Sequence, residues 1–360
     1  MTSAAPRLDA TIAQISSKID RTVRRSFLTF ATRCSLPEVG LFTSTLLSSA
    51  ESGKRFRALS SVLGAATWLA RTDDSAPEEL LLRAATESNL ALGAALEFYQ
   101  AAALVHDDIV DRAEERRGKP ATHRAFAAAE GSDHFGVSAG ILGGDFLLSA
   151  AEMALDEAAS PTRQPELRQR FHQMTGEVAY GQFLDLQASF APLGELELIR
   201  QVIRLKSARY SVAHPVALGA LQAGADPEWA HTLEQVFEPA GVAFQLRDDH
   251  LGVLGEPTQT GKPAGGDIVE RKRTVLLALT VQQAPAAQRR QLEEIYRQEP
   301  GPEQVAQARD LIETYGVGPH EEYLARELDL AHHRLAEAKL PGPAQELCLA
   351  FIRLLVERDR

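Results

Sequence analysis

Apolar residues recur at steps of three and four along nearly every long segment of this chain, which is the spacing that gives an α-helix one apolar face. Alternation with a period of two, the pattern of a half-buried strand, is almost absent. Turn signals stand between the helical blocks, and Asp226 followed by Pro227 predicts a helix start. We therefore expect an all-α fold, with long helices over residues 78–111, 135–155, 166–190, 196–221 and 228–254.

Charge and cysteine content narrow the setting of the protein. The 360 residues carry a net charge of −11, which argues against a nucleic-acid-binding surface. The two cysteines, Cys34 and Cys348, lie near opposite ends of the chain and form no zinc-type spacing, so we expect a reducing, cytoplasmic location. No apolar run approaches the ~20 residues of a membrane span, and we expect no integral membrane segment.

No low-complexity hinge divides the chain. We expect a single domain over residues 1–360, with a motif-bearing core over 53–272 and more peripheral helices over 284–360. The stretch 255–267 is rich in Gly, Pro and Thr and carries Lys262. Such a stretch is typical of a loop that closes over a bound ligand.

Two clusters of aspartates end apolar helical segments. Asp107 and Asp111 are four residues apart, so both project from one face of the first helix, with Asp108 beside them. Asp248 and Asp249 end the second helix. One such cluster is as consistent with a solvated helix end as with a metal site, but two clusters of crowded carboxylates favour Mg²⁺ and a phosphate-bearing substrate.

Cationic residues surround these clusters in the sequence. For any one of them a solvated surface position is the more common outcome, but together they match the forks and point charges that phosphate oxygens require. They occur as Gly53-Lys54-Arg55-Phe56-Arg57, as Arg116-Arg117-Gly118, and as Lys206, Lys262, Lys272 and Arg273.

In this ordered set of motifs the chain resembles the trans-isoprenyl diphosphate synthases, also called polyprenyl synthetases, and most of all a geranylgeranyl diphosphate synthase. The resemblance covers residues 53–272, and the C-terminal helices fit by type alone. Besides the segments above, the motifs are Gly181-Gln182-Phe183-Leu184-Asp185, Lys206-Ser207-Ala208-Arg209-Tyr210 and Phe244-Gln245 before the second aspartate pair.

The resemblance implies a bundle of about a dozen helices around a central active-site cavity. It implies a head-to-tail condensation of isopentenyl diphosphate with an allylic diphosphate, in a homodimer. It also implies about three Mg²⁺ ions in each active site, with Mn²⁺ as an alternative. The implied metal ligands are Asp107, Asp108, Asp111, Asp248 and Asp249.

Further roles follow from the same resemblance. Isopentenyl diphosphate is expected at Lys54, Arg57, Gln100 and Arg117. The allylic diphosphate is expected at Arg116, Lys206, Ser207, Gln245, Lys262 and Lys272. Among these, Lys206, Gln245 and Lys262 are the expected catalytic residues. His106 and His250 need no catalytic role, since released diphosphate can take the proton.

Some positions depart from the family pattern. Gly252 stands where the family often has the third aspartate of the second motif, which puts one metal–water contact in doubt. Ser207 replaces Thr and keeps the hydroxyl, and Gln100 replaces a His. Ala58 stands where Pro usually follows the first cationic segment.

Two alternatives from other classes stay open. A class I terpene cyclase shares the first aspartate motif, the fold and Mg²⁺, but has no need of Gly53 to Arg57 to hold a second diphosphate. A non-catalytic subunit of a heteromeric synthase typically loses motif aspartates, and here both pairs persist.

Small residues precede the first aspartate cluster. Ala103 and Ala102 lie four and five residues before Asp107, and Tyr99 lies a further helical turn back on the same face. We expect the Tyr99 ring to form the floor of the product tunnel, with Phe98 beside it. These chain-length positions, Tyr99, Ala102 and Ala103, favour the 20-carbon geranylgeranyl diphosphate over farnesyl or geranylfarnesyl diphosphate.

Overall fold

The computed structural model describes residues 5–37, 40–51, 53–160, 162–255 and 265–356. Over this part of the chain the all-α prediction is confirmed. The one exception among the described residues is a short hairpin with two residues in each strand, β1 (Glu115–Arg116) and β2 (Lys119–Pro120). In this hairpin Arg116 pairs with Lys119. The helical pattern of the sequence gave no sign of this hairpin.

Several helices begin where a side chain binds the first exposed backbone N–H groups. The predicted start at Asp226 is confirmed, since its Oδ1 accepts from Trp229 N at 2.7 Å and α11 (Pro227–Leu254) follows. Ser132 caps α7 (Asp133–Ala158) and Thr274 caps α14 (Val275–Gln283) in the same way. These caps explain why the helices begin at these residues.

Two of the predicted helices differ from the structure. The helix expected over 78–111 is broken into α4 (Pro77–Ala84) and α5 (Glu87–Val110), because the Thr86 side chain accepts from Asn89 N at 3.2 Å and starts a new helix. The helix expected over 196–221 consists of α9 (Leu196–Val202), a π-helical segment η1 (Ile203–Ala213) and α10 (His214–Gln222). The π-helical segment contains Lys206 and Ser207, and such segments often occur at functional sites.

The chain divides into two compact units. The first takes in residues 1–171, 215–231 and 341–347, and the second takes in 172–214, 232–340 and 348–360. α8 (Gln164–Ala188), α11 and α18 (Gly342–Val356) contribute residues to both units. The single domain over 1–360 stays a prediction.

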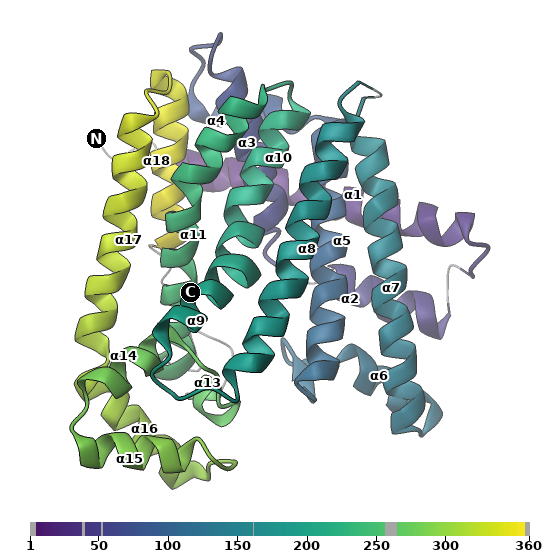
Figure 1. Ribbon diagram of the computed structural model, residues 1–360. Helices are drawn as coiled ribbons and strands as arrows, with labels where there is room; N and C mark the ends of the chain where they lie inside the picture. Colours follow the sequence, from purple (N-terminus) through teal and green to yellow (C-terminus); the bar gives the residue numbers. More distant parts are fainter. Residues whose placement is uncertain (1–4, 38–39, 52, 161, 256–264, 357–360) are drawn as a thin grey trace. The chain divides into compact units, whose positions relative to one another are not determined.

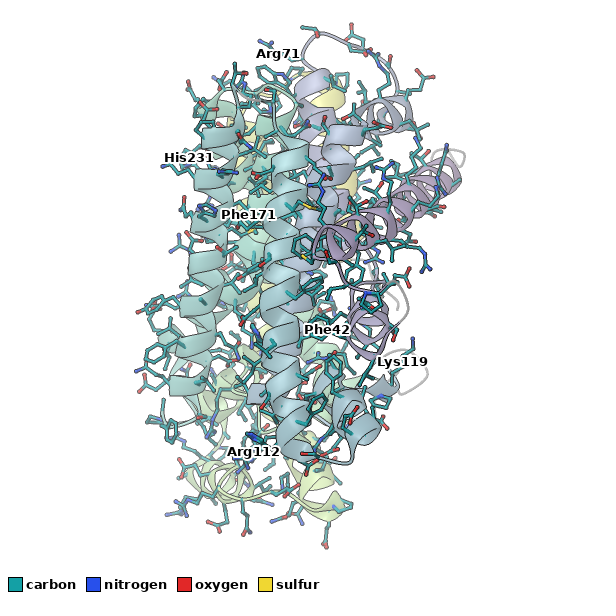
Figure 2. The ribbon with its side chains drawn as sticks, turned by 90° about the vertical axis from the view of Figure 1, so that its right-hand side faces the viewer. Phe42, Arg71, Arg112, Lys119, Phe171 and His231 are labelled. Atoms are coloured by element: carbon teal, nitrogen blue, oxygen red, sulfur yellow. The ribbon has the colours of Figure 1, made fainter. Side chains whose placement is uncertain are left out.

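The first unit is built around α5 and α7, which lie side by side (Figure 1). α1 (Ala5–Arg33), α3 (Phe56–Leu69) and α6 (Thr122–Glu130) pack against this pair. Buried aromatic rings fill the space between the helices: Phe27 contacts Phe98 on α5 and Phe146 on α7. Phe42, on α2 (Leu41–Glu51), contacts the same Phe146 ring and is labelled in Figure 2.

α3 and the part of α10 that begins at Pro215 belong to the first unit, and they approach each other backbone to backbone. A β-carbon on Gly64 would lie 1.8 Å from the Val216 carbonyl oxygen, and one on Gly219 would lie 1.8 Å from the Ser61 carbonyl oxygen. Only glycine leaves room for this contact, and it leaves room on both helices. The crossing fixes α3, whose first residue, Phe56, lies inside the motif Gly53 to Arg57.

The second unit holds two buried apolar clusters. One joins the end of α11 to α13 (Gly266–Val269), α14, α15 (Ala286–Ile295) and α16 (Pro302–Tyr315), through residues such as Val253, Ile268 and Ile312 (Figure 1). The other joins α9 and η1 to α11, α14 and α17 (Val317–Glu337), through residues such as Ile203, Leu246 and Leu324. Both clusters contact the segment of α11 that carries the second aspartate pair.

One helix in the described part of the chain, α7, is long and apolar enough to cross a membrane by length and composition. The sequence pattern had indicated no such segment. The signal is weak, because α7 packs against α5 and α6 along its length and buries its glycine and alanine positions there.

Candidate active site

The first aspartate cluster lies at the C-terminal end of α5. Asp107 and Asp111 are one helical turn apart, with the Asp111 N–H donating to the Asp107 carbonyl at 2.8 Å, so both carboxylates belong to one face. Asp107 is partly exposed and Asp111 is exposed. Arg112, the next residue along the chain, is labelled at the lower end of α5 in Figure 2. The pair is therefore open to a cation from solvent.

Asp108 differs from its neighbours because it points into the unit. Its side chain is buried, and the Arg116 guanidinium binds it through Nε at 2.8 Å and through Nη2. Arg116 Nη2 also lies 3.4 Å from Asp107 Oδ2. Burial raises the pKa of the Asp108 carboxyl, and Arg116 offsets part of that shift. The β1–β2 hairpin thus fixes a cation beside the cluster.

The motif Gly53 to Arg57 lies against the same hairpin. The Arg117 Nη1 atom is 3.0 Å from the place a β-carbon on Gly53 would occupy. Arg55 and Arg117 both have φ of 56°, a left-handed backbone that costs energy outside glycine. Burial and the nearby Arg116 lower the pKa of Arg117, Glu97 opposes the shift, and Arg57 and Arg55 lower the pKa further. Four guanidinium groups are thus close enough to repel, which is a setting that an anion would stabilise.

The residues of this motif have different surroundings. Arg55 is buried in an ion pair with Glu97 on α5 and another with Asp20 at 2.6 Å, so it anchors the loop. Lys54 is exposed, whereas Arg57 and Gln100 are half-buried. The exposed and half-buried residues are the ones that the sequence assigns to isopentenyl diphosphate.

The chain-length residues lie along α5. Ala102 is fully buried, Ala103 is half-buried, and Tyr99 is 7% exposed with its ring 6.0 Å from Phe171, edge to face. Burial raises the pKa of the Tyr99 phenol, although the neighbouring Arg57 opposes the shift. Phe98 is buried against Phe27. Tyr99 therefore lies between an aromatic contact and a residue of the cationic motif.

In the second unit, η1 carries Lys206 and Ser207 to different partners. Lys206 Nζ lies 2.7 Å from Asp185 Oδ2 on α8, which joins the two motifs that contain these residues. The Ser207 hydroxyl donates to Gln245 Oε1 at 2.5 Å, and Gln245 Nε2 donates to Asp249 Oδ1 at 2.8 Å. This Ser207–Gln245–Asp249 chain holds one carboxylate of the second cluster in place.

The second cluster contains one carboxylate that sequence reasoning missed. Asp248 is exposed and Asp249 is buried, and burial followed by the charge of Asp267 raises the pKa of Asp249 well above its ordinary value. Asp267, on α13, occupies the space beside Gly252: a β-carbon at position 252 would lie 2.2 Å from Asp267 Oδ2. Lys272 Nζ binds Asp267 Oδ1 at 3.1 Å and Glu270 at 2.7 Å.

These contacts identify Asp267 as a third acid near the gap left by Gly252. The sequence carried one signal for Asp267, because this acid stands between the glycine-rich loop and Lys272. The remaining predicted residue, Lys262, lies in 256–264, outside the described residues, as does most of the predicted closing loop.

The donor set of each unit fits a hard divalent cation. Asp107 and Asp111 share a face that opens to solvent, and burial together with the nearby Asp267 raises the pKa of the buried Asp249. A cation would relieve that carboxylate repulsion, and oxygen ligands of this kind suit Mg²⁺.

Comparison with known proteins decides the family. The polyprenyl synthetase family model matches residues 41–314, which include both aspartate clusters, the Gly53 to Arg57 motif and η1. The chain belongs to the polyprenyl synthetase family. A solved polyprenyl synthetase, the geranylgeranyl pyrophosphate synthase of Corynebacterium glutamicum in complex with isoprenyl diphosphate and magnesium, is 33% identical, with a TM-score of 0.82. The match covers 95% of this chain and 99% of that one.

Curated polyprenyl synthetases match over shorter regions. A short chain isoprenyl diphosphate synthase of Methanocaldococcus jannaschii is 30% identical over 62% of this chain and 61% of its own length. A geranylfarnesyl diphosphate synthase of Aeropyrum pernix is 34% identical over 54% of this chain and 59% of its own length. The chain thus spans about three fifths of the length of these relatives.

Proposed function

We propose that this polyprenyl synthetase joins isopentenyl diphosphate to an allylic diphosphate, head to tail, with Mg²⁺. The observation that carries the proposal is the pairing of each aspartate cluster with its own cations. Arg116 and Arg117 stand beside the cluster on α5, and Lys272 stands beside Asp267 and Asp249. Carboxylates suited to a metal, set next to cations suited to phosphate, match a diphosphate substrate that arrives with its metal.

The allylic diphosphate is assigned to Arg116, Lys206, Ser207, Gln245, Lys262 and Lys272. Lys206 and Ser207 lie in successive positions of η1, and the bond from Ser207 to Gln245 supports the orientation of Asp249. Asp107, Asp108, Asp111, Asp248 and Asp249 are the proposed ligands of about three Mg²⁺ ions, with Mn²⁺ as an alternative. Bound Mg²⁺ would supply Lewis-acid stabilisation of the departing diphosphate.

Isopentenyl diphosphate is assigned to Lys54, Arg57, Gln100 and Arg117. The close approach of the Arg117 guanidinium to Gly53 supports this grouping within the first unit. In the reaction, the carbon–oxygen bond of the allylic substrate breaks and its electron pair leaves with the diphosphate. The double bond of isopentenyl diphosphate attacks the allylic cation, and a proton then leaves the new cation for the released diphosphate. The protein holds the two diphosphates in place and supplies no general base.

The proposed product is geranylgeranyl diphosphate. Support comes from the small residues Ala102 and Ala103 before Asp107 and from the buried ring of Tyr99 one turn further back. Farnesyl and geranylfarnesyl diphosphate are the alternatives, and the matched relatives differ among themselves in the product they are named for. Tyr99→Ala should lengthen the product and Ala103→Phe should shorten it to 15 carbons, by chromatography of the reaction mixture.

A homodimer in the cytoplasm completes the proposal. In the first unit α7 exposes Phe135, Val137, Ile141 and Leu142, an apolar set that a second copy would cover. Both described cysteines are free, Cys34 exposed and Cys348 buried, which agrees with a reducing compartment.

The test of the reaction uses the purified full chain with Mg²⁺, labelled isopentenyl diphosphate and an allylic primer. We expect elongation that is lost on chelation of the metal and restored by adding Mg²⁺. Asp107→Ala and Asp248→Ala should each lower turnover at least a hundredfold while thermal unfolding stays near that of the unaltered chain. Asp133→Ala is the control, because Asp133 is an exposed aspartate at the start of α7. Normal turnover in both cluster variants would overturn the metal assignment.

A further inference from the structure

A fully buried histidine in the second unit has no visible reason for its polarity. His320 lies in the first turn of α17 and is 0% exposed, and neither of its ring nitrogens has a hydrogen-bond partner among the described residues. A buried polar group without a partner destabilises the folded state. Burial, and after it the nearby His250 and Arg247, lower the pKa of His320 to about 4, so the imidazole is neutral at pH 7 with a lone pair available.

Two more ligand groups face this histidine. The His250 ring centroid lies 6.0 Å from that of His320, and His250 Nδ1 lies 3.6 Å from Glu321 Oε1. One ligand atom from each of His250, His320 and Glu321 lies within 4.8 Å of the others. His250 Nδ1 is itself buried and makes no hydrogen bond with any described residue.

From this geometry we propose that His250, His320 and Glu321 form a site for a borderline divalent cation of the Zn²⁺ class. Two imidazoles and a carboxylate are a donor set that Zn²⁺ uses, with a water in the fourth position. Donors at zinc-bonding distance in a tetrahedron are about 3.3 Å apart. The His250–Glu321 separation of 3.6 Å is close to that value, and the ligand atom of His320 lies within 4.8 Å of the other two.

Arg247 sets a limit on the affinity of this site. Its Nη1 donates to Glu321 Oε1 at 3.2 Å, so a positive charge already stands beside the ligands. Glu321 has a second oxygen for a metal, and Arg247 would then orient the carboxylate from outside. Mg²⁺ prefers oxygen ligands and would not compete well for two imidazoles.

The site would join two helices at a point next to the second aspartate cluster. His250 directly follows Asp249 on α11, whereas His320 and Glu321 begin α17. A cation held by both helices would pin the end of α11 and thereby limit the motion of Asp248 and Asp249. This gives His250 a role in positioning and not in the chemistry of the reaction.

In the experiment, the full chain is first stripped of metal with a chelator and then given excess Mg²⁺. Co²⁺, and separately Zn²⁺, is then added. We expect the visible absorption of tetrahedral Co²⁺, its displacement by Zn²⁺, and a rise in the unfolding temperature with Zn²⁺. His250→Gln and Glu321→Gln should each weaken Co²⁺ binding at least tenfold. Glu321→Gln is the variant least expected to disturb folding, because this residue lies half-exposed on the surface.

Two controls separate this site from others. His333→Gln removes an exposed histidine that lies 3.3 Å from Glu337, and it should leave Co²⁺ absorption unchanged. Asp248→Asn removes an acid of the proposed Mg²⁺ site and should also retain the absorption. The proposal is overturned if the unaltered chain gives no Co²⁺ spectrum, or if His250→Gln and Glu321→Gln bind Co²⁺ as tightly as the unaltered chain does. A buried water would then be the partner of His320. Neither result bears on the prenyl transfer reaction.

Discussion

Single residues in this protein differ in surroundings even where they adjoin in sequence. Arg116 is held by the buried Asp108, whereas Arg117 lies against Gly53. At the second cluster, Gly252 has no carboxylate, and the Asp267 carboxylate occupies the space beside it. Sequence motifs identify such residues, but the partner that each side chain finds decides what its removal does.

Gly252→Asp would restore the acid that the family often has at this position, and we expect it to impair the protein. The new β-carbon would meet the Asp267 carboxylate, which Lys272 already binds. Forcing the two apart should cost about 1–3 kcal/mol of stability and lower turnover. Chemical denaturation and the elongation assay measure the two effects. Asp267→Ala in the same chain should recover part of the loss, and a gain of activity in Gly252→Asp alone would contradict this account.

Arg116→Ala and Arg117→Ala should separate stability from substrate use. Loss of Arg116 leaves the buried Asp108 without its ion-pair partner and should cost about 2 kcal/mol in the free energy of unfolding, after allowing for the partial exposure of the guanidinium. Arg117→Ala should fold normally and raise the KM for isopentenyl diphosphate. If both variants lose the same stability and keep the same KM, the two arginines have only a structural role.

The helices and their breaks show how much of the secondary structure can be predicted from the sequence. The helical period predicts α7, α8 and α11 to within three residues at each end, because their apolar faces are continuous. It misses the break at Thr86, where one local hydrogen bond overrides an unbroken apolar pattern. It also misses η1, whose extra residue per turn leaves no mark in the spacing of apolar residues. The motif residues were predictable, and Asp267 could have been suspected from its place between the glycine-rich loop and Lys272. His320 and Glu321 carried no such signal, since only the contact between α17 and the end of α11 brings them to His250.

Three elements of the second unit meet at Glu177, and acid should loosen them. Glu177 on α8 binds Arg209 of η1 at 2.6 Å and the buried His214 at 2.8 Å. Burial alone would raise the pKa of Glu177, but the bonds from His214 and Arg209 outweigh burial and lower it well below 4.5. The carboxylate therefore adds stability above pH 4.5, and that contribution is lost as the pH falls below that value.

Glu177→Gln should therefore lower the free energy of unfolding at pH 7 by about 2 kcal/mol. The loss relative to the unaltered chain should shrink as the pH falls from 4.5 toward 2, because Glu177 takes up a proton there in the unfolded chain before it does so in the folded one. Denaturant unfolding over this pH range provides the measurement. Glu313→Gln, at an exposed position of α16, is the control and should match the unaltered chain at each pH. A constant difference at all pH values would show that charge is not involved.

At the scale of the whole molecule, exposed apolar side chains are the main unexplained feature. In the first unit they gather on α7, where Leu142 is 63% exposed. In the second unit Phe183 on α8 and Phe190 after it are exposed as well. An acidic chain of this size gains little from leaving such side chains in water, so a second copy is the expected cover.

Leu142→Glu should convert the proposed dimer to a monomer. A carboxylate buried in an apolar interface loses its hydration without a partner, which disfavours association strongly. Light scattering after size-exclusion chromatography gives the mass directly. Leu330→Glu alters an exposed leucine on α17 and should leave the mass unchanged. A monomeric mass for the unaltered chain would instead assign the exposed face of α7 to some other partner.

The contact between α3 and α10 has a consequence for how this chain can vary over time. At Gly64 and Gly219 each helix backbone fills the space that the other residue's side chain would need. A larger residue at one position therefore cannot be compensated by a smaller residue at the other, since both positions already have glycine. A saturation library selected for a folded product should return glycine at both positions, while the flanking surface residues drift. If both positions stay glycine, the crossing of α3 and α10 stays constant while product length and metal preference change during evolution.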